Sequence, residues 1–311
     1  MSKIAFVFPG QGSQALGMGK DWFDQFPTEL SVLKAAVLSA FGDSLFNVMW
    51  GESEPDLGVT TNTQPALFVT SAAIITILQS KGYAPDFVAG HSLGEYSALF
   101  AAEAFDFTSG LDLVKHRSQL MEKAMPAGTG TMAAIMGLAP EQIKSLCEAT
   151  PGIVEVANYN NDNQTIISGE KAAVLAAMVA IKAAGAKRAI ELNVSGPFHS
   201  SLMKPAAQAF RQVLDDTVIS NAKIPVIANC TAKPEISPNE IRDNLVSQLS
   251  HSVYWLQSIQ YMVAQGVTCF VECGSGKVLS GIIKRIAPEA TILSCEKVSD
   301  LSAVDALMVR S

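Results

Sequence analysis

The stretch Phe87-Val88-Ala89-Gly90-His91-Ser92-Leu93-Gly94 decides the fold, because it joins a short apolar strand to a helical pattern through a glycine-flanked turn. It carries the pattern G-x-S-x-G, whose glycines permit a tight strand-to-helix turn that exposes the serine. Amides at the start of the helix can stabilise a developing oxyanion. The context predicts Ser92 as a nucleophile, with a plain helix N-cap as the alternative. His91 is expected to point away and is a poor base.

Short apolar runs alternate with longer helical patterns around this turn, which is typical of α/β proteins with a largely parallel sheet. The expected strands are short and apolar: Lys3–Phe8, Phe87–Ala89, Ile224–Asn229, Val267–Cys273 and Thr291–Cys295. The expected helices are longer: Phe26–Ala40, Ala66–Gln79, Ser92–Ala104, Ser109–Ala124 and one that begins at Pro238 after Ser237.

The middle of the chain has a different order of elements. Strands are expected at Thr131–Leu138, Ile153–Asn160, Gln164–Ser168 and Arg188–Val194, with helices at Pro140–Ala149 and Lys171–Ala184. This βαββαβ order is typical of ferredoxin-like domains. The sequence therefore predicts a large, α/β-hydrolase-like domain from residues 1–126 and 196–311, interrupted by a small ferredoxin-like domain at 127–195.

Composition excludes several classes of protein. The 311 residues are 49% apolar and only 16% charged, which excludes a disordered chain. The net charge of −7 argues against a nucleic-acid partner or an anionic membrane surface. The longest apolar stretch, Ala66 to Leu78, is about five residues too short to span a membrane. The N-terminal apolar run is too short for a signal peptide, so a cytoplasmic location is expected.

The five cysteines are scattered and never spaced C-x-x-C, so we expect neither a disulfide framework nor a metal site. The glycine-rich turn Gly10–Ala15 formally fits a dinucleotide fingerprint, but no second strand ends in an acidic residue at the required distance. No cofactor is expected. An amide donor from this turn to a site beside Ser92 fits better, because α/β-hydrolase-like sites take one oxyanion donor from a distant loop.

Arg117 interrupts the apolar stripe of the helix expected at Ser109–Ala124, whereas His116 lies on the polar side of that helix. A buried arginine is costly without an anionic or carbonyl partner. Two interpretations stay open, namely a structural ion pair and a fork that binds a substrate carboxylate.

Two other histidines remain as candidates for a general base. His199 follows Pro197-Phe198 where the chain leaves the small domain, and ligand sites favour domain junctions. His251 follows a helical segment and is typical of a helix-end residue. The sequence favours His199.

With these motifs together, the chain resembles the malonyl-CoA:acyl-carrier-protein transacylases, acyltransferases of fatty-acid and polyketide synthesis. The resemblance covers nearly the whole length and rests on four motifs in order: Phe8–Gln14, Gly90–Tyr96, Arg117 and Pro197–Ser200, with Phe270–Gly274 near the end.

The resemblance implies a malonyl transfer from malonyl-CoA to the phosphopantetheine thiol of an acyl carrier protein, by a ping-pong reaction through a malonyl-serine. It implies a role for each matching residue: Ser92 as nucleophile, His199 as base, Arg117 as the ligand of the malonyl carboxylate, the Gln11 and Leu93 N–H groups as oxyanion hole, and the Gln248 carbonyl as the group that orients His199. Phe198 resembles the malonyl-selective members. A monomer is expected.

The chain departs from the family's usual pattern at three positions. Ser252 and Tyr254 stand where a proline and an arginine are usual, and Ser275 stands where a proline is usual. These departures put the geometry of the local loops in doubt.

Two rival functions stay open. A serine esterase or thioesterase of the α/β-hydrolase type would need an acid between the serine and a late histidine, and Asp112 and Asp162 lie in the right interval. A non-catalytic subunit that binds a carrier protein is the second rival.

Overall fold

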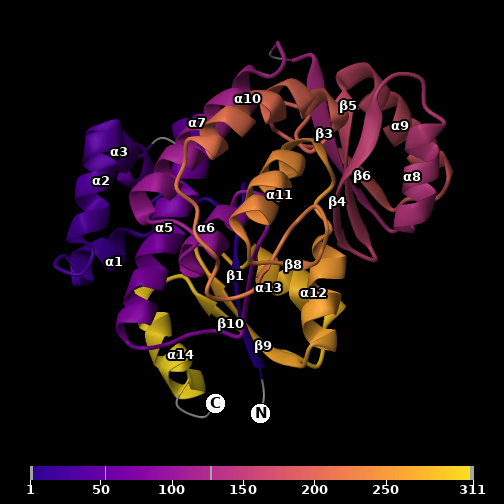
Figure 1. Cartoon of the computed structure of the whole chain (residues 1–311). Helices are drawn as coiled ribbons and strands as arrows, with labels where there is room; N and C mark the ends of the chain where they lie inside the picture. Colours follow the sequence, from indigo (N-terminus) through magenta and orange to yellow (C-terminus); the bar gives the residue numbers. More distant parts are fainter. Residues whose placement is uncertain (1–2, 53, 127, 309–311) are drawn as a thin grey trace.

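The computed structural model describes residues 3–52, 54–126 and 128–308 and contains two separate sheets (Figure 1). The large sheet has the strand order β10-β9-β1-β2-β7-β8. Its strands are β1 (Lys3–Phe8), β2 (Phe87–Gly90), β7 (Val226–Ile227), β8 (Pro234–Glu235), β9 (Val267–Cys273) and β10 (Thr291–Cys295). Every pair except β7 with β8 is parallel, which confirms the α/β class with a mainly parallel sheet.

Helices cover both faces of the large sheet, as a buried parallel sheet requires. Ile4 and Phe6 of β1 belong to the core that contains α5 (Thr60–Ser80), α6 (Gly94–Ala101) and α7 (Phe107–Lys123). Ala5 and Val7, on the opposite face, pack with α12 (Trp255–Ala264) and α13 (Val278–Ile286). The remaining elements of this part are α1 (Lys20–Gln25), α2 (Ser31–Phe41), α3 (Ser44–Trp50), α4 (Glu54–Gly58), α10 (Lys204–Asp215), α11 (Pro238–Ser250), α14 (Leu301–Met308) and the 3₁₀ turns Ser201–Met203 and Val298–Asp300.

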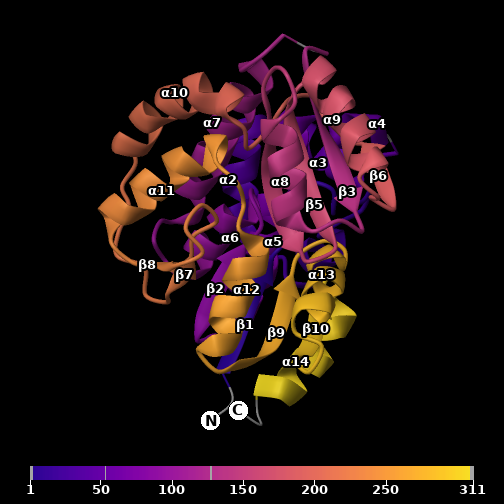
Figure 2. The ribbon, with the colours of Figure 1, turned by 90° about the vertical axis from the view of Figure 1, so that its right-hand side faces the viewer.

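The small sheet is antiparallel and has the order β4-β5-β3-β6. Its elements are β3 (Gly130–Met136), α8 (Pro140–Glu148), β4 (Val154–Asn161), β5 (Gln164–Glu170), α9 (Lys171–Ala183) and β6 (Arg188–Glu191). Both helices pack on one face of this sheet (Figure 2), so the expected ferredoxin-like βαββαβ pattern is confirmed. The domain limits at 127–195 stay a prediction, and residue 127 lies outside the described residues.

The other face of the small sheet is turned toward the large sheet. Met132 and Ile166 on this face join the core of the large part. The segment after α11 also pairs with the edge of β4, since the Tyr159 N–H donates to the Val253 carbonyl at 2.9 Å and the Val253 N–H donates to the Ala157 carbonyl at 2.8 Å. The two parts of the chain therefore meet along a packed and hydrogen-bonded junction.

Several expected elements begin or end elsewhere. The strand expected at Arg188–Val194 ends at Glu191, because the Val194 N–H donates to the Leu192 carbonyl and not to β3, and the helix expected at Ala66–Gln79 begins at Thr60. The strand expected at Ile224–Asn229 is reduced to β7, because the Asn229 N–H leaves the ladder and donates to the carboxylate of Glu95. The helix expected at Phe26–Ala40 begins at Ser31, since the proline that follows Phe26 disfavours helical geometry there. The helix expected at Ser92–Ala104 extends only from Gly94 to Ala101, and Ser92 is not part of it because its φ of 52° is left-handed.

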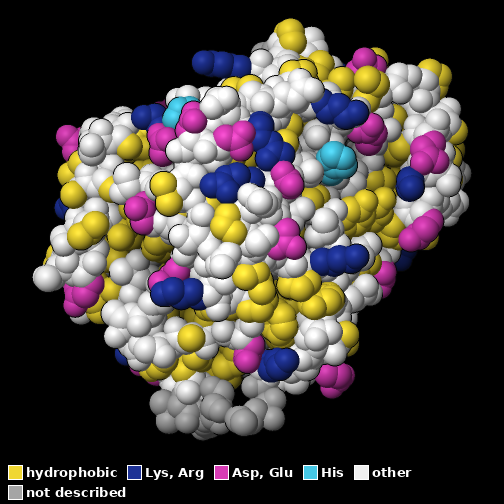
Figure 3. Space-filling model, viewed as in Figure 1, with side chains coloured by type: hydrophobic (Ala, Val, Ile, Leu, Met, Phe, Trp, Pro, Cys, Tyr) yellow, Lys and Arg dark blue, Asp and Glu magenta, His cyan; other side chains and the backbone are white. Residues whose placement is uncertain are grey.

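On the face in Figure 3, basic and acidic side chains are interspersed. No single helix among the described residues has the length and apolar character needed to cross a membrane, although Ser31–Phe41 and Ser44–Trp50 pass that test as a sharply bent pair. All five cysteines are described, and all are free.

Candidate active site

Ser92 lies in a sharp turn between β2 and α6. Its φ of 52° is left-handed, so it cannot be the first residue of the helix, and Leu93 is the N-cap instead. The interpretation of Ser92 as a plain N-cap is therefore wrong. A Cβ on Gly90 would overlap the backbone of Gly94, and a Cβ on Gly94 would overlap the carbonyl of Phe8. The two glycines of the motif are thus required by close backbone contact.

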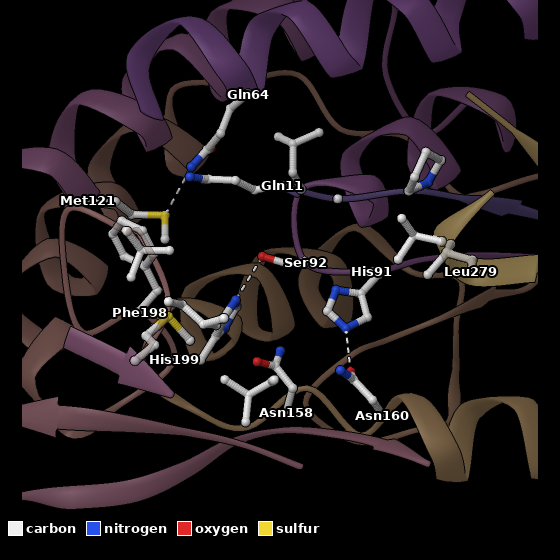
Figure 4. A pocket seen from close by; sticks show the side chains of 18 of the residues that line it. Gln11, Gln64, His91, Ser92, Met121, Asn158, Asn160, Phe198, His199 and Leu279 are labelled. Atoms are coloured by element: carbon white, nitrogen blue, oxygen red, sulfur yellow. Dashed lines mark hydrogen bonds between the residues drawn. The ribbon is translucent and has the colours of Figure 1, made fainter. Parts of the chain in front are cut away.

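Ser92 and His199 are hydrogen-bonded, although 107 positions separate them in the chain. The distance from Ser92 Oγ to His199 Nε2 is 2.7 Å (Figure 4). His199 Nδ1 lies 2.8 Å from the carbonyl oxygen of Gln248, which can only accept. The proton therefore sits on Nδ1, and Nε2 is free to accept the proton of the Ser92 hydroxyl. Sequence reasoning chose this histidine, and the structure brings it to the serine.

His199 is held in its neutral form. Its side chain is almost fully buried, and burial together with the positive charge of Arg117 lowers the pKa of His199 to about 3. The hydrogen bond to Gln248 acts in the opposite direction. At neutral pH the imidazole is therefore unprotonated and can accept a proton.

Arg117 of α7 is completely buried beside the serine. Its Nη1 donates to Gln64 Oε1 at 2.6 Å, and its Nη2 donates to Gln248 Oε1 at 2.9 Å and to Ser92 Oγ at 3.1 Å. No carboxylate among the described residues lies within 4.0 Å of its guanidinium, so the interpretation as a structural ion pair is wrong. Burial lowers the pKa of Arg117, but a guanidinium still carries its charge at neutral pH. The site thus holds a desolvated cation that bonds no carboxylate directly and interacts with the buried carboxyl of Glu95 only at longer range.

Gln248 connects the arginine to the histidine. Its main-chain carbonyl accepts from His199, and its side-chain oxygen accepts from Arg117. Its Nε2 donates at 2.9 Å to both the Ser92 carbonyl and Glu95 Oε2. Glu95 is fully buried, and desolvation raises its pKa to about 7.

Two backbone amides near Ser92 are free. The N–H groups of Gln11 and Leu93 make no hydrogen bond to another described residue, whereas the Ser92 N–H is already bonded to Asn229 Oδ1. Gln11 lies in the turn after β1, next to Gly10, whose carbonyl accepts from the main chain and the side chain of Ser13. Both free amides belong to residues that line the same pocket as Ser92.

This pocket has a volume of about 180 Å³ and lies between the two sheets. Its wall near Ser92 is mostly apolar and comes from both parts of the chain: Met121, Met132, Ile166, Leu192, Val194 and Phe198. Figure 4 shows Phe198 and Met121 beside His199, on the side where Gln64 and Gln11 also lie. An apolar pocket with a few convergent polar groups is typical of a small-molecule site.

The other three histidines hydrogen-bond groups other than the Ser92 hydroxyl. Nε2 of His91 lies 2.9 Å from Asn160 Oδ1, so this side chain lines the pocket without contacting the Ser92 hydroxyl (Figure 4). His116 lies beside Asp112 on the outer side of α7. His251 is the C-cap of α11, as expected, with Nδ1 2.8 Å from the Ser247 carbonyl.

A sequence model of the family described as "acyl transferase domain" matches residues 5–301. The chain belongs to the acyl transferase family. The malonyl CoA-acyl carrier protein transacylase of Bacillus subtilis (strain 168) is 44% identical to this acyl transferase over 289 residues, which are 92% of this chain and 91% of that protein.

Solved structures agree with this assignment. The crystal structure of an acyl carrier protein S-malonyltransferase from Vibrio cholerae has a TM-score of 0.93 and 43% identity and covers 97% of this chain and 100% of that one. A malonyl-transacylase in complex with a type II PKS acyl-carrier protein has a TM-score of 0.94 and 40% identity, with 100% of both chains covered. The resemblance to this family is confirmed.

Ser252, Tyr254 and Ser275, the three residues expected to depart from the family's usual pattern, each make a contact in the acyl transferase. Ser252 Oγ donates to the Val156 carbonyl at 2.5 Å, which joins the large part to β4. Tyr254 stacks on Tyr159 with ring centroids 5.3 Å apart, across the same junction. Ser275 Oγ donates at 2.8 Å to the carbonyl of Ser13, in the turn that contains Gln11. A proline at position 252 or 275 could not make these side-chain hydrogen bonds.

Three residues of the site were not found from the sequence of the acyl transferase: Gln64, Glu95 and Asn229. Each is a buried polar residue whose partners lie far away in the chain. A polar residue next to an apolar run is the only signal in the sequence, and such residues are common. No group of three or more potential metal ligands occurs in the part of the chain that the structure describes.

Proposed function

We propose that this acyl transferase moves a malonyl group from malonyl-CoA to the phosphopantetheine thiol of an acyl carrier protein, through a malonyl ester of Ser92. One observation carries the proposal: the buried Arg117 has no carboxylate partner in the described part of the chain and lies 3.1 Å from Ser92 Oγ. A substrate carboxylate would supply the missing anion. The names of the relatives support the same substrate and the same acceptor.

The first half-reaction forms the ester. Ser92 Oγ attacks the thioester carbonyl of malonyl-CoA while His199 Nε2 takes the hydroxyl proton. The negative charge on the carbonyl oxygen is stabilised by the N–H groups of Gln11 and Leu93, and one such donor is worth about 10²–10³ in rate. The carbon–sulfur bond then breaks, and the CoA thiolate leaves with the proton held by His199.

The second half-reaction runs the same chemistry in reverse. His199 takes the proton of the carrier's phosphopantetheine thiol, and the sulfur attacks the malonyl ester. The bond to Ser92 Oγ breaks, and the serine recovers its proton from His199. Arg117 holds the malonyl carboxylate throughout, which keeps the ester oriented for a thiol.

Ser92 and His199 form a pair without an acid, and a main-chain carbonyl occupies the position that the acid has in a Ser-His-Asp triad. The Gln248 carbonyl fixes the histidine tautomer as a carboxylate does, with less stabilisation of the imidazolium. An esterase of the triad type would place an acid at this point, and His199 Nδ1 faces a main-chain oxygen instead. The serine esterase alternative also leaves Arg117 without a role. Malonyl transfer is therefore favoured.

Phe198 contributes to the selectivity of the proposed reaction. Phe198, almost fully buried in the pocket wall, leaves little room for an α-methyl group, and one methyl is worth about 1–3 kcal/mol. The monomeric state, the cytoplasmic location, the absence of a cofactor and the division of the chain at 127–195 stay predictions from the sequence.

Intact mass spectrometry tests the proposal. Malonyl-CoA should add one malonyl group to the wild-type chain, and subsequent addition of a carrier protein with its phosphopantetheine arm should remove that mass and place it on the carrier. The Ser92→Ala variant should gain no mass. Ser97→Ala is the matched control, because Ser97 is buried in α6 near the turn and its hydroxyl has no partner in the described chain.

Two results would contradict the proposal. Retained label in Ser92→Ala excludes the serine as nucleophile. Release of free malonate, with none on the carrier, favours the esterase.

A further inference from the structure

Asn229 is a buried residue just after β7 that lies against the turn containing the proposed nucleophile. It is 137 positions from Ser92 in the chain. Its side chain bonds to both sides of the turn, because Oδ1 accepts from the Ser92 N–H at 2.7 Å and Nδ2 donates to the Gly90 carbonyl at 2.6 Å. One amide group thus connects the residue before His91 to the residue after it.

The main chain of Asn229 is equally constrained. Its N–H donates to Glu95 Oε2 at 3.0 Å, and its carbonyl accepts from the Tyr254 N–H at 2.8 Å. Glu95 belongs to α6, which follows the turn, and the same carboxylate oxygen accepts from Gln248. All the polar groups of Asn229 are therefore used, and they link the turn to the residue that bonds His199.

These contacts act where the backbone is under strain. Ser92 has a left-handed φ of 52°, a conformation that is unfavourable for a residue with a side chain and persists only where the surroundings impose it. The bond to Asn229 Oδ1 also occupies the Ser92 N–H, whereas the next amide, that of Leu93, stays free. The side chain of Asn229 thus stabilises the conformation in which Ser92 Oγ meets His199.

We propose that Asn229 is a positioning residue for Ser92: its side-chain amide holds the Gly90–Ser92 backbone in the geometry that aligns the hydroxyl with His199 and leaves the Leu93 N–H free. This inference rests on the proposed role of Ser92 as nucleophile. Asn229 itself touches no substrate and acts through the turn.

The test measures the reactivity of Ser92 in two ways. A fluorophosphonate labels an activated serine and carries no carboxylate, so its rate reports on the serine, the histidine and the oxyanion donors without a bond between Arg117 and a substrate carboxylate. Malonylation by malonyl-CoA in a single turnover reports on the same groups together with Arg117. Circular dichroism and thermal unfolding show which variants are folded.

Asn229→Ala removes both side-chain bonds to the turn. We expect the rates of fluorophosphonate labelling and malonylation to fall by a similar factor of about 10², because small displacements of a reacting group have effects of this size. The KM for malonyl-CoA should change by less than about threefold, since the pocket and Arg117 are untouched. Asn244→Ala is the matched control, because Asn244 is a half-buried asparagine whose side chain bonds Glu235 and the Cys230 thiol and makes no hydrogen bond to the turn; it should label at the wild-type rate.

Asn229→Asp covers the case in which the alanine variant does not fold. It keeps the size of the side chain and the acceptor for the Ser92 N–H but loses the donor to the Gly90 carbonyl, so labelling should fall at least about tenfold. Labelling of the folded variants at the wild-type or the Asn244→Ala rate overturns the proposal, and so does a KM effect without a rate effect. If the wild type takes the fluorophosphonate but no malonyl group, the proposed function fails while the role of Asn229 is still tested. If Ser92 takes neither, both fail.

Discussion

Replacing Arg117 with alanine separates binding of the malonyl carboxylate from the chemistry at Ser92. A hydrogen bond to a charged group is worth about 1.5–3 kcal/mol, so two parallel bonds to a carboxylate supply about 3–6 kcal/mol. In the structure Arg117 already donates to Gln64, Gln248 and Ser92, and binding substrate exchanges some of these bonds. The net gain lies at the lower end, and at 1.4 kcal/mol per factor of ten it corresponds to about 10² in kcat/KM.

The assay compares malonyl-CoA with acetyl-CoA as donors under single-turnover conditions. Arg117→Ala should lose about 10² in kcat/KM for malonyl transfer and less than about fivefold for acetyl transfer, because an acetyl group has no carboxylate for the arginine. Arg117→Lys should recover only part of the loss, since lysine keeps the charge without the planar fork.

Arg242→Ala is the control for loss of a partly buried arginine. Arg242 donates to the carbonyls of Leu214 and Thr217 and lines no part of the pocket. It should leave the ratio of malonyl to acetyl transfer unchanged. Equal losses for the two donors in Arg117→Ala would refute the reasoning and make the arginine a structural residue.

Two further predictions concern His199 and the turn. Because the pKa of His199 is about 3 in the folded chain and 6.5 in the unfolded chain, protons bind preferentially to the unfolded state as the pH falls from 6.5 toward 3, and stability decreases over that range. Urea unfolding at pH 5 and pH 7 should show a smaller decrease for His199→Gln, and an equal decrease would contradict the assignment. Gly90→Ala should abolish labelling of Ser92, because its Cβ would overlap the backbone of Gly94. Gly281→Ala, where a Cβ meets no atom within 4 Å, should label normally, and normal labelling of Gly90→Ala would disprove the required close contact.

Local patterns were enough to predict most of the fold. The strands at Lys3–Phe8, Val267–Cys273 and Thr291–Cys295 have the predicted limits, because continuous apolar runs bounded by polar residues are strong strand signals. The predicted strand at Ile224–Asn229 is too long, and the cause is a set of long-range contacts that no local sequence pattern indicates. Asn229 uses its amides on the turn at Ser92 and on Glu95 instead of the sheet.

The candidate site also has features that local patterns predict and features that they do not. The burial of Arg117 could be predicted from its place in an apolar helical stripe. Its partners Gln64 and Gln248 could not be predicted, because they lie 53 and 131 positions away in the chain. The choice between the two interpretations of Arg117 depends on which groups surround it in space. Its guanidinium donates to two amide oxygens and a hydroxyl.

The sequence by itself determined most of the strands and the main helices, their α/β order, the glycine-flanked turn at Ser92 and the inward face of Arg117, because each depends on residues that are close along the chain. Only the tertiary structure decided that His199 rather than His251 meets the serine, that a main-chain carbonyl of Gln248 bonds the histidine, and that Asn229 holds the turn. The physical reason is that these are hydrogen bonds between groups tens to hundreds of positions apart. A backbone carbonyl is present at every residue, so nothing in the sequence marks the one that is used.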